Sequence, residues 1–181
     1  MEEKRLNGKT SDGETLVIDT SAFLVDNSIE FLRNHQCYTV PEVIDEVKTM
    51  RHKICIDILQ DAGALSVVEP STEDLGALVS AAKKTGDLSS LSKTDVALLA
   101  LALRLKRHGL NPLLLTDDYT IQNLASHIGI RYKGLKVTSI RRRIKWHYYC
   151  NACNSTYNEY LKRCPICGHE VKRKPARYEE L

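Results

Sequence analysis

Cysteines near the end of the chain place the strongest limit on what it can fold into. Four of the six cysteines follow the pattern Cys150-x2-Cys153-x10-Cys164-x2-Cys167. Each Cys-x2-Cys pair can direct two thiolates at one tetrahedral Zn²⁺, and four thiolates complete the coordination of that ion. About thirty residues cannot build a core unaided, so this segment is expected to fold as a small zinc ribbon around a structural ion.

Before the cysteines, short apolar runs alternate with helical patterns. The runs that we expect to form strands are 16–19, 37–40, 66–68, 113–115 and 130–132. The clearest helical pattern is SKTDVALLALALRLKRHG, which begins at the capping residue Ser92, is basic in its last turn and ends at Gly109. Strands that alternate with helices predict an α/β domain with a mostly parallel central sheet over residues 15–138.

The charge of the chain is divided unevenly. Residues 1–140 carry 16 Lys and Arg against 19 Asp and Glu, whereas residues 141–181 carry 10 against 4. A mildly acidic domain joined to a basic end indicates a nucleic-acid partner that binds mainly at that end. The expected organisation is a disordered N-terminus (1–14), the α/β domain (15–138), a basic linker (139–146), the zinc ribbon (147–175) and a solvated tail (176–181).

We expect no contact with a membrane. No run in the sequence approaches the roughly 18 consecutive apolar residues of a spanning helix. The first residues, MEEKRLNGKTSDGE, are polar and charged and lack the apolar centre of a signal peptide. These features, with cysteines spaced for a metal and not for disulfides, favour a cytoplasmic protein.

Acidic residues recur where the predicted strands end and the helices begin. Asp19 directly follows the apolar run LVI, and Glu46 belongs to the helical stretch PEVIDEV. Asp95 lies in the first turn of the Ala/Leu-rich helix, and the run LLLT is followed by Asp117 and Asp118. Because strand ends and adjacent helix N-termini converge on one edge of a parallel sheet, these carboxylates can share a pocket. Clustered carboxylates repel one another, and the ordinary remedy is a hard divalent cation, Mg²⁺ or Mn²⁺.

Each of these acids also has an ordinary structural explanation. Asp95 suits the positive end of a helix dipole, and Glu46 can belong to a solvated helix face. Asp117 or Asp118 can cap the helix that follows them. Asp19 is the hardest to explain in this way, because its neighbours on the strand are apolar and a buried carboxylate needs a partner. The occurrence of all four positions in this order favours the metal site.

The motifs VIDTS, PEVIDEV, SKTDVALLALAL and LLLTDDYTIQNLA resemble those of the PIN domain, a metal-dependent nuclease fold. The resemblance covers residues 16–135 and implies a three-layer α/β fold. It further implies that one or two Mg²⁺ or Mn²⁺ ions are bound by four acids, which fall on Asp19, Glu46, Asp95 and the pair Asp117/Asp118. The resemblance does not separate the two members of that pair.

Basic and aromatic side chains surround the cysteines. Basic residues follow phosphates, and aromatic rings can stack on bases, so this part of the chain is expected to bind RNA. Several of the aromatic rings can equally well pack between the two hairpins of a ribbon. The candidate RNA-binding residues are Arg141, Arg142, Arg143, Lys145, Trp146, Lys162, Arg163, Lys172, Arg173 and Lys174.

A PIN-like domain followed by a zinc ribbon resembles the Nob-type endonucleases of ribosome assembly. That resemblance implies an endoribonuclease that cleaves precursor small-subunit (16S) rRNA at its mature 3′ end. The implied partners are this precursor rRNA, the assembling small ribosomal subunit and a KH-type assembly factor. The implied ions are a structural Zn²⁺ and a catalytic Mn²⁺ or Mg²⁺.

Three other functions are compatible with parts of the sequence. A PIN-type toxin ribonuclease shares the nuclease chemistry but is normally a single domain without a ribbon. A non-catalytic RNA-binding assembly factor would not need all four acidic positions. A zinc-ribbon accessory protein of transcription or translation would show no Mn²⁺-dependent cleavage.

Overall fold

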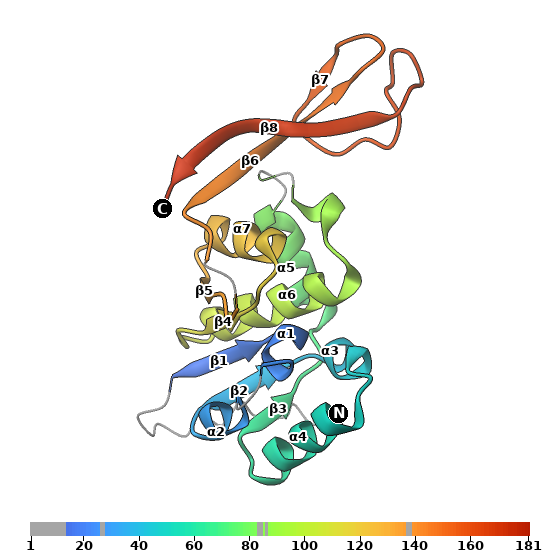
Figure 1. Ribbon diagram of the computed structural model, residues 1–181. Coiled ribbons are helices and arrows are strands. Elements are labelled where there is room, and N and C mark those ends of the chain that lie inside the picture. The colour runs from blue at the N-terminus through green and yellow to red at the C-terminus, as the bar shows by residue number, and fades with distance from the viewer. Residues whose placement is uncertain (1–13, 26–27, 83–84, 86, 137–138) are drawn as a thin grey trace.

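The chain forms an α/β domain and a long β-ribbon that lies against one end of it (Figure 1). The computed structural model describes residues 14–25, 28–82, 85, 87–136 and 139–181. Among the helices of these residues, none is both long and apolar enough to cross a lipid bilayer. Of the expected disordered N-terminus 1–14, only Glu14 belongs to the described residues, and its carboxylate pairs with Arg131 at 2.7 Å.

The α/β domain is built on a five-stranded sheet in the order β3-β2-β1-β4-β5. Every pairing in this sheet is parallel, which confirms the predicted fold class. Leu16, Val17 and Ile18 of the central strand are completely buried, as expected where helices cover both faces of a parallel sheet. The strands are β1 (Thr15–Ile18), β2 (Gln36–Thr39), β3 (Leu65–Val67), β4 (Leu113–Leu115) and β5 (Arg131–Lys133).

Helices form the outer two of three layers (Figure 1). Right-handed crossovers place the helices that join β1, β2 and β3 on one face and those that join β3, β4 and β5 on the other. The first group is α1 (Thr20–Phe23), α2 (Ser28–Arg33), α3 (Pro41–Glu46) and α4 (Met50–Asp61). The second group is α5 (Thr72–Ala82), the 3₁₀ helix η1 (Leu88–Ser90), α6 (Lys93–Arg107) and α7 (Tyr119–His127).

Helix α6 is the central helix of the second group. Residues 97–102 are all buried, so this helix is covered on nearly every side. It begins at Ser92, whose hydroxyl accepts from the backbone N–H of Asp95 while the Asp95 carboxylate accepts from the backbone N–H of Ser92. Arg104, Lys106 and Arg107 in the last turn suit the negative end of its dipole.

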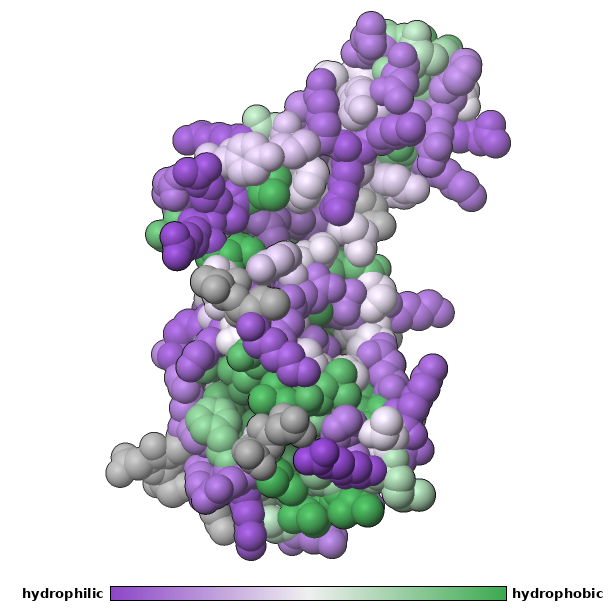
Figure 2. Space-filling view, in the orientation of Figure 1, coloured by the Kyte–Doolittle hydropathy of each residue, from purple (hydrophilic) through white to green (hydrophobic). Residues whose placement is uncertain are grey.

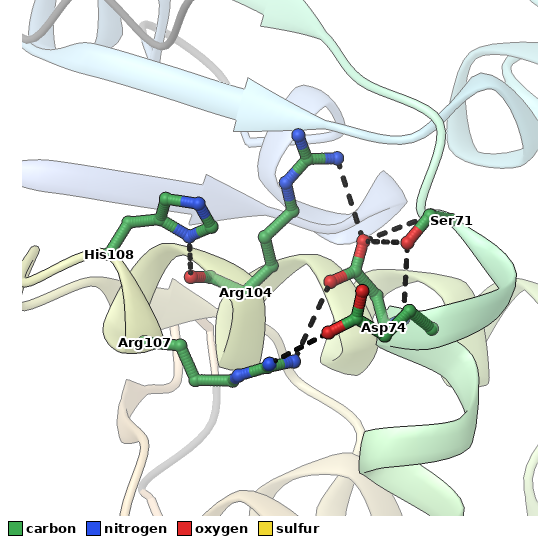
Figure 3. A network of polar contacts seen from close by, with 6 residues as sticks. Ser71, Asp74, Arg104, Arg107 and His108 are labelled. Atoms are coloured by element: carbon green, nitrogen blue, oxygen red, sulfur yellow. Dashed lines mark hydrogen bonds and ion pairs between the residues drawn. The ribbon is translucent and has the colours of Figure 1, made fainter. Parts of the chain in front are cut away.

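A network of ion pairs fastens the start of α5 to the end of α6 (Figure 3). The buried carboxylate of Asp74 lies 3.5 Å from Arg104 and 4.0 Å from Arg107. The same carboxylate accepts from the hydroxyl of Ser71 at 2.8 Å, and Glu73 pairs with Arg107 at 3.0 Å. The contacts fix the direction of α6, whose first turn carries Asp95 at the opposite end.

The order of the strands reverses at the carboxyl end of β1, and we call this edge of the sheet the crevice. From β1 the chain builds outward through β2 and β3 on one side, and through β4 and β5 on the other. Open α/β sheets bind ligands beyond the strand ends at such a reversal. Asp19 and Thr116 directly follow the two strands at this point, and the backbone N–H of Asp19 donates to the carbonyl of Leu115 at 3.2 Å.

The ribbon is built from two long antiparallel strands and one short strand. These are β6 (Arg142–Cys150), β8 (Val171–Glu180) and β7 (Thr156–Tyr157), which pairs with the other edge of β6. A β-bulge between Lys145 and Trp146 shifts the register of the two long strands. Bulges bend the strands that carry them.

Two predicted segments are wrong at this end of the chain. Most of the expected basic linker 139–146 lies in β6, and most of the expected tail 176–181 lies in β8. The physical reason is that the two long strands carry complementary charges at the open end of the ribbon. Arg142 pairs with Glu180 at 2.6 Å, and Arg143 pairs with Glu179 at 2.7 Å.

Candidate active site and zinc site

Asp19 is held rigidly at the crevice by three donors. It caps α1, where its Oδ1 accepts from the backbone N–H of Thr20 at 2.7 Å. Its Oδ2 accepts from the hydroxyl of Thr116 at 2.7 Å and from the hydroxyl of Ser21 at 3.3 Å. A carboxylate with donors on both oxygens keeps a fixed orientation, which a metal ligand or a catalytic base requires.

The electrostatics of Asp19 are typical of a functional carboxylate. Burial raises the pKa of Asp19 above its ordinary value, and hydrogen bonds from Thr116 and Thr20 oppose that rise. The nearby charge of Asp95 raises the pKa further. A buried acid beside a second acid in a crevice is a candidate functional site, because a bound cation would relieve both the desolvation and the repulsion.

Glu46 is linked to Asp19 through Thr20, for which no metal-site role was predicted. The hydroxyl of Thr20 donates to Oε2 of Glu46 at 2.9 Å, while the backbone N–H of Thr20 donates to Asp19. Thr20 therefore links the two acids, although they come from different elements. The only sequence signal for this role is a hydroxyl directly after Asp19.

Asp95 caps helix α6 and also lies near Asp19. One of its oxygens closes the capping box of α6 with the backbone N–H of Ser92 at 2.7 Å. Among the described residues, its other oxygen has no hydrogen-bond partner, and Asp95 acts electrostatically on Asp19. The cap thus holds the carboxylate at the crevice.

The structure separates the adjacent acids Asp117 and Asp118. The carboxylate of Asp117 accepts from the backbone N–H groups of Leu135 at 2.7 Å and of Lys136 at 3.1 Å, so it orders the loop after β5. Asp118 caps α7 through Oδ1, which accepts from the backbone N–H of Thr120 at 2.6 Å. The backbone N–H of Asp118 donates to Thr116, the residue that also holds Asp19. Asp118 is therefore the better candidate ligand.

A further carboxylate lies next to the first turn of α6. A cavity of about 350 Å³ is lined there by Glu42, Leu91 and Ser92, among others. Oε2 of Glu42 is buried and has no hydrogen-bond partner among the described residues. Buried carboxylate oxygens normally have a partner, so this atom is available to a cation or a water molecule.

The carboxylates are more widely spaced than the cysteines. Within the part of the chain that the structure describes, one group of at least three potential ligands has all its ligand atoms within 4.8 Å of one another. That group is the predicted set Cys150, Cys153, Cys164 and Cys167. The acids instead surround the crevice from β1, α3, α6 and the β4–α7 junction, an oxygen-rich donor set that suits Mg²⁺ or Mn²⁺ better than softer metals.

The two cysteine pairs have the same local geometry. In each pair the residue after the second cysteine has a positive φ, 58° at Asn154 and 75° at Gly168. Its backbone N–H donates to the carbonyl of the first cysteine, Cys150 at 2.9 Å and Cys164 at 2.8 Å. These turns bring four sulfur atoms together without a disulfide, which is the donor set of a structural zinc site.

Tyr157 supports the cysteine cluster from β7. Its hydroxyl lies 3.0 Å from Sγ of Cys164. Donation from this hydroxyl lowers the pKa of Cys164 to about 6, which favours the thiolate that a metal needs. The corresponding pKa of Tyr157 is raised to about 12, because the same hydrogen bond is lost when the phenol ionises.

One face of the ribbon is basic and open to solvent. Across the two long strands Lys145 is opposite Arg177, His147 is opposite Lys174 and Tyr149 is opposite Lys172, and opposed residues share a face. The four basic side chains Lys145, Lys172, Lys174 and Arg177 are exposed. Lys174 lies 4.8 Å from the ring centre of Tyr149. We call these six residues the basic face; Figure 2 shows that hydrophilic residues dominate the visible surface of the ribbon.

Other predicted RNA-binding residues have internal partners or lie elsewhere. Arg142 and Arg143 form the ion pairs that close the end of the ribbon. The guanidinium of Arg173 lies 4.3 Å from the ring centre of Trp146 and donates to the hydroxyl of Ser90 at 2.6 Å. Three further predicted residues are exposed away from the basic face, namely Arg141, Lys162 and Arg163.

Comparison with known proteins agrees with this arrangement. A model of the PIN domain of ribonuclease matches residues 16–105. Ribonuclease VapC1 of Thermoplasma acidophilum is 37% identical over 89% of this chain and 78% of that protein. The 20S-pre-rRNA D-site endonuclease NOB1 of Saccharomyces cerevisiae is 30% identical over 54% of this chain and 22% of that protein.

The endoribonuclease Nob1 of Pyrococcus abyssi matches both parts of the molecule. It is 40% identical over 164 residues, which are 90% of this chain and 94% of that protein. The similarity thus extends over nearly the full length of both proteins. The chain therefore belongs to the Nob1 family of PIN-domain endoribonucleases.

Proposed function

We propose that this protein is a metal-dependent endoribonuclease that cleaves precursor small-subunit (16S) rRNA at its mature 3′ end. The observation that carries the proposal is the orientation of Asp19 by Thr20 and Thr116 at the crevice, with Asp95 beside it. The similarity to Nob1 proteins, and to a yeast protein named for pre-rRNA cleavage, supports this choice of substrate. Such a nuclease would act where small subunits assemble, which we take to be the cytoplasm.

The acids around the crevice are the proposed ligands of a catalytic Mn²⁺ or Mg²⁺. They are Asp19, Glu46, Asp95 and Asp118, whereas Asp117 is assigned to the loop after β5. A bound divalent ion would supply an activated water molecule and charge stabilisation. Thr20 and Thr116 keep the Asp19 carboxylate in place during the reaction. Water adds to phosphorus, the bond to the 3′ oxygen breaks, and the products carry a 5′-phosphate and a 3′-hydroxyl.

The ribbon is the proposed RNA-recognition module. Zn²⁺ held by the four cysteines would order it, and the basic face would bind the phosphates of the assembling small subunit. Among the described residues, Lys145, Lys172 and Lys174 of that face form no ion pair, whereas Arg177 lies 3.8 Å from Glu179; these three exposed lysines support this role. A KH-type assembly factor is a further proposed partner. Under this proposal the α/β domain cleaves the RNA, and the ribbon determines the position of the cleavage.

Cleavage of a defined RNA tests the proposal. The full-length protein is incubated with an RNA that spans the 3′ end of the small-subunit rRNA, with Mn²⁺ and with EDTA. We expect one main cut that needs Mn²⁺ and disappears in Asp19→Asn, while Asp57→Asn on the exposed face of α4 cleaves like the wild type. Cleavage by Asp19→Asn at the wild-type rate would overturn the assigned mechanism.

A toxin-type ribonuclease is the second candidate, because one similar protein is named VapC1. The two candidates differ in the RNA that they cut. A toxin-type enzyme would cleave unrelated RNAs at rates close to that of the rRNA fragment, and substitutions on the basic face would not move the cut. A non-catalytic assembly factor would bind the fragment and leave it intact with every divalent ion.

A further inference from the structure

The ribbon is joined to the α/β domain through the peptide group of Ile144. Oδ1 of Asn123 on α7 accepts from the backbone N–H of Ile144 at 2.6 Å. Nδ2 of the same amide donates to the carbonyl of Ile144 at 2.9 Å. The side chain of Asn123 thus pairs with β6 as the backbone of a neighbouring strand would. Nε2 of His127, one turn later, lies 3.0 Å from the same carbonyl.

Asp87 determines which way the Asn123 amide faces. Nδ2 of Asn123 donates its second hydrogen to Oδ1 of Asp87 at 2.9 Å. An amide turned by half a rotation would direct its oxygen at the Asp87 carboxylate and at the Ile144 carbonyl, and all of these atoms are acceptors. The carboxylate therefore selects the one orientation of Asn123 that can pair with β6.

Burial of the Asp87 carboxylate is energetically unfavourable, which indicates that this residue is kept for its effect on the orientation of Asn123. Asp87 is completely buried, and Asn123 is 6% exposed. Oδ2 of Asp87 has no hydrogen-bond partner among the described residues, and burial raises the pKa of this carboxyl group. An apolar residue at this position would avoid the desolvation, so the carboxylate is explained better by its effect on Asn123 than by overall stability.

The segment around Asp87 contacts the ribbon at two further points. The carbonyl of Thr85 accepts from the backbone N–H of Trp146 at 3.1 Å, next to the β-bulge. The hydroxyl of Ser90 accepts from Arg173 of β8 and donates to the carbonyl of Asp87 at 2.7 Å. Both long strands of the ribbon are therefore attached to one short segment of the α/β domain.

The segment around Asp87 and helix α7, which hold the ribbon, also lead to acids of the crevice. Residues 88–90 form η1, which leads through Leu91 to Ser92 and the capping box of Asp95. Helix α7 begins at its cap Asp118 and presents Asn123 in its second turn. The ribbon is thus fastened to α7 and to the segment that leads into α6, so its direction is linked to the position of the acids at the start of these two helices.

We propose that Asp87 and Asn123 are positioning residues that fix the ribbon relative to the crevice and thereby determine which phosphodiester is cut. The proposal rests on the proposed function of the two modules. RNA held on the basic face enters the crevice at a set distance only while the junction is rigid. A loosened junction leaves both modules intact but changes the position of cleavage. The reason is that the affinity gained when one RNA binds two sites depends on the distance and direction between those sites.

The test uses the full-length protein and two RNAs, a long fragment that spans the rRNA 3′ end and a short unstructured oligonucleotide. The variants are Asn123→Asp, which directs a carboxylate at Asp87, and the exchange Asp87→Asn/Asn123→Asp, which restores a donor–acceptor pair. We expect Asn123→Asp to cut the oligonucleotide like the wild type. On the long fragment its rate falls about tenfold and its cuts spread over neighbouring positions, and the exchange restores much of the single cut.

Asp87→Asn is the conservative control, because its side-chain oxygen still accepts from Asn123, and it should retain the wild-type cut. Zinc content and circular dichroism check that each variant is folded, and Asn123→Leu replaces Asn123→Asp if the latter is not. An unchanged single cut by every folded Asn123 variant overturns the positioning role. Failure of the wild-type protein to cut either RNA overturns the proposed function instead.

Discussion

The hydroxyl of Thr116 donates a 2.7 Å hydrogen bond to Oδ2 of Asp19, although 97 positions separate the two residues in the sequence. The same oxygen of Thr116 accepts from the backbone N–H of Asp118 at 3.1 Å. One hydroxyl therefore orders two of the acids at the crevice. It connects the ends of the two strands between which the sheet reverses its order.

We predict that Thr116→Val lowers the cleavage rate about tenfold with little change in fold, because residues that orient metal ligands typically have effects of this size. Loss of a donor to the ionised form also raises the pKa of Asp19 further, so the acid limb of the pH–rate profile moves to higher pH. Profiles of wild type, Thr116→Val and the control Thr120→Val measure this. A limb that moves to lower pH in Thr116→Val would contradict the assigned hydrogen bond.

Tyr157→Phe should weaken zinc binding about tenfold or more, because it removes the donor that stabilises the Cys164 thiolate. Competition with a chromophoric chelator measures the affinity directly. Tyr160→Phe is the matched control, since that ring is exposed and packs edge-on against Tyr148. Equal zinc affinities of the two variants would show that Tyr157 does not tune the site.

Chosen cations of the ribbon should differ in their effect on RNA binding. Lys174→Ala is expected to reduce the slope of log affinity against log salt by about 0.7–0.9, the value for one lost phosphate contact. Arg142→Ala should change the slope less, because Arg142 is already paired with Glu180 at 2.6 Å. Filter binding at several salt concentrations measures both. A larger effect for Arg142 would place the RNA away from the basic face.

The buried carboxyl group of Asp87 predicts a pH-dependent stability difference. Burial raises its pKa above 3.8, against the opposing effects of Asn123, Thr85, His127 and Arg173. The folded state therefore binds the proton more tightly than the unfolded state, and the contribution of Asp87 to stability is lost as pH rises through its folded pKa. Asp87→Asn has no such loss.

The free energy of unfolding of Asp87→Asn should thus exceed that of wild type by an amount that grows as pH rises from 3.8 and then levels off. Urea unfolding of the zinc-loaded proteins at a series of pH values measures the difference. Asp57→Asn, which replaces an exposed acid, serves as the control. A difference that shrinks with rising pH would mean that Asp87 is stabilised as a carboxylate.

Much of the α/β domain could be predicted from the sequence because its elements carry local patterns. The apolar runs around Leu16 and Leu114 give strands, and the cap Ser92 and the dense Ala/Leu pattern give α6. The sulfur cluster could be predicted from the cysteine spacing, because each Cys-x2-Cys pair forms a local turn. The parallel sheet then follows from the alternation of strands and helices.

Features that depend on distant partners could not be predicted. Asp117 and Asp118 both follow the same strand, and they differ only because the loop at Leu135 and Lys136 directs its N–H groups at one of them. The run of arginines after Ile140 suggested a linker, since its acidic partners lie some 36 positions later. Asp87 and Asn123 carry no periodic signal, and the hydrogen bonds of Asn123 to Asp87 and to Ile144 exist only in the folded chain.

The pairing of β1 with β4 has a consequence for the cell that makes this protein. Asp19 contacts Thr116 only when β1 and β4, which are far apart in the sequence, lie side by side. A partly synthesised chain on the ribosome therefore has no assembled crevice. Any opening that parts these strands disperses the acids in the same event. If these acids form the active site, as proposed, the protein cannot cleave RNA until its fold is complete, and it loses that ability whenever it unfolds.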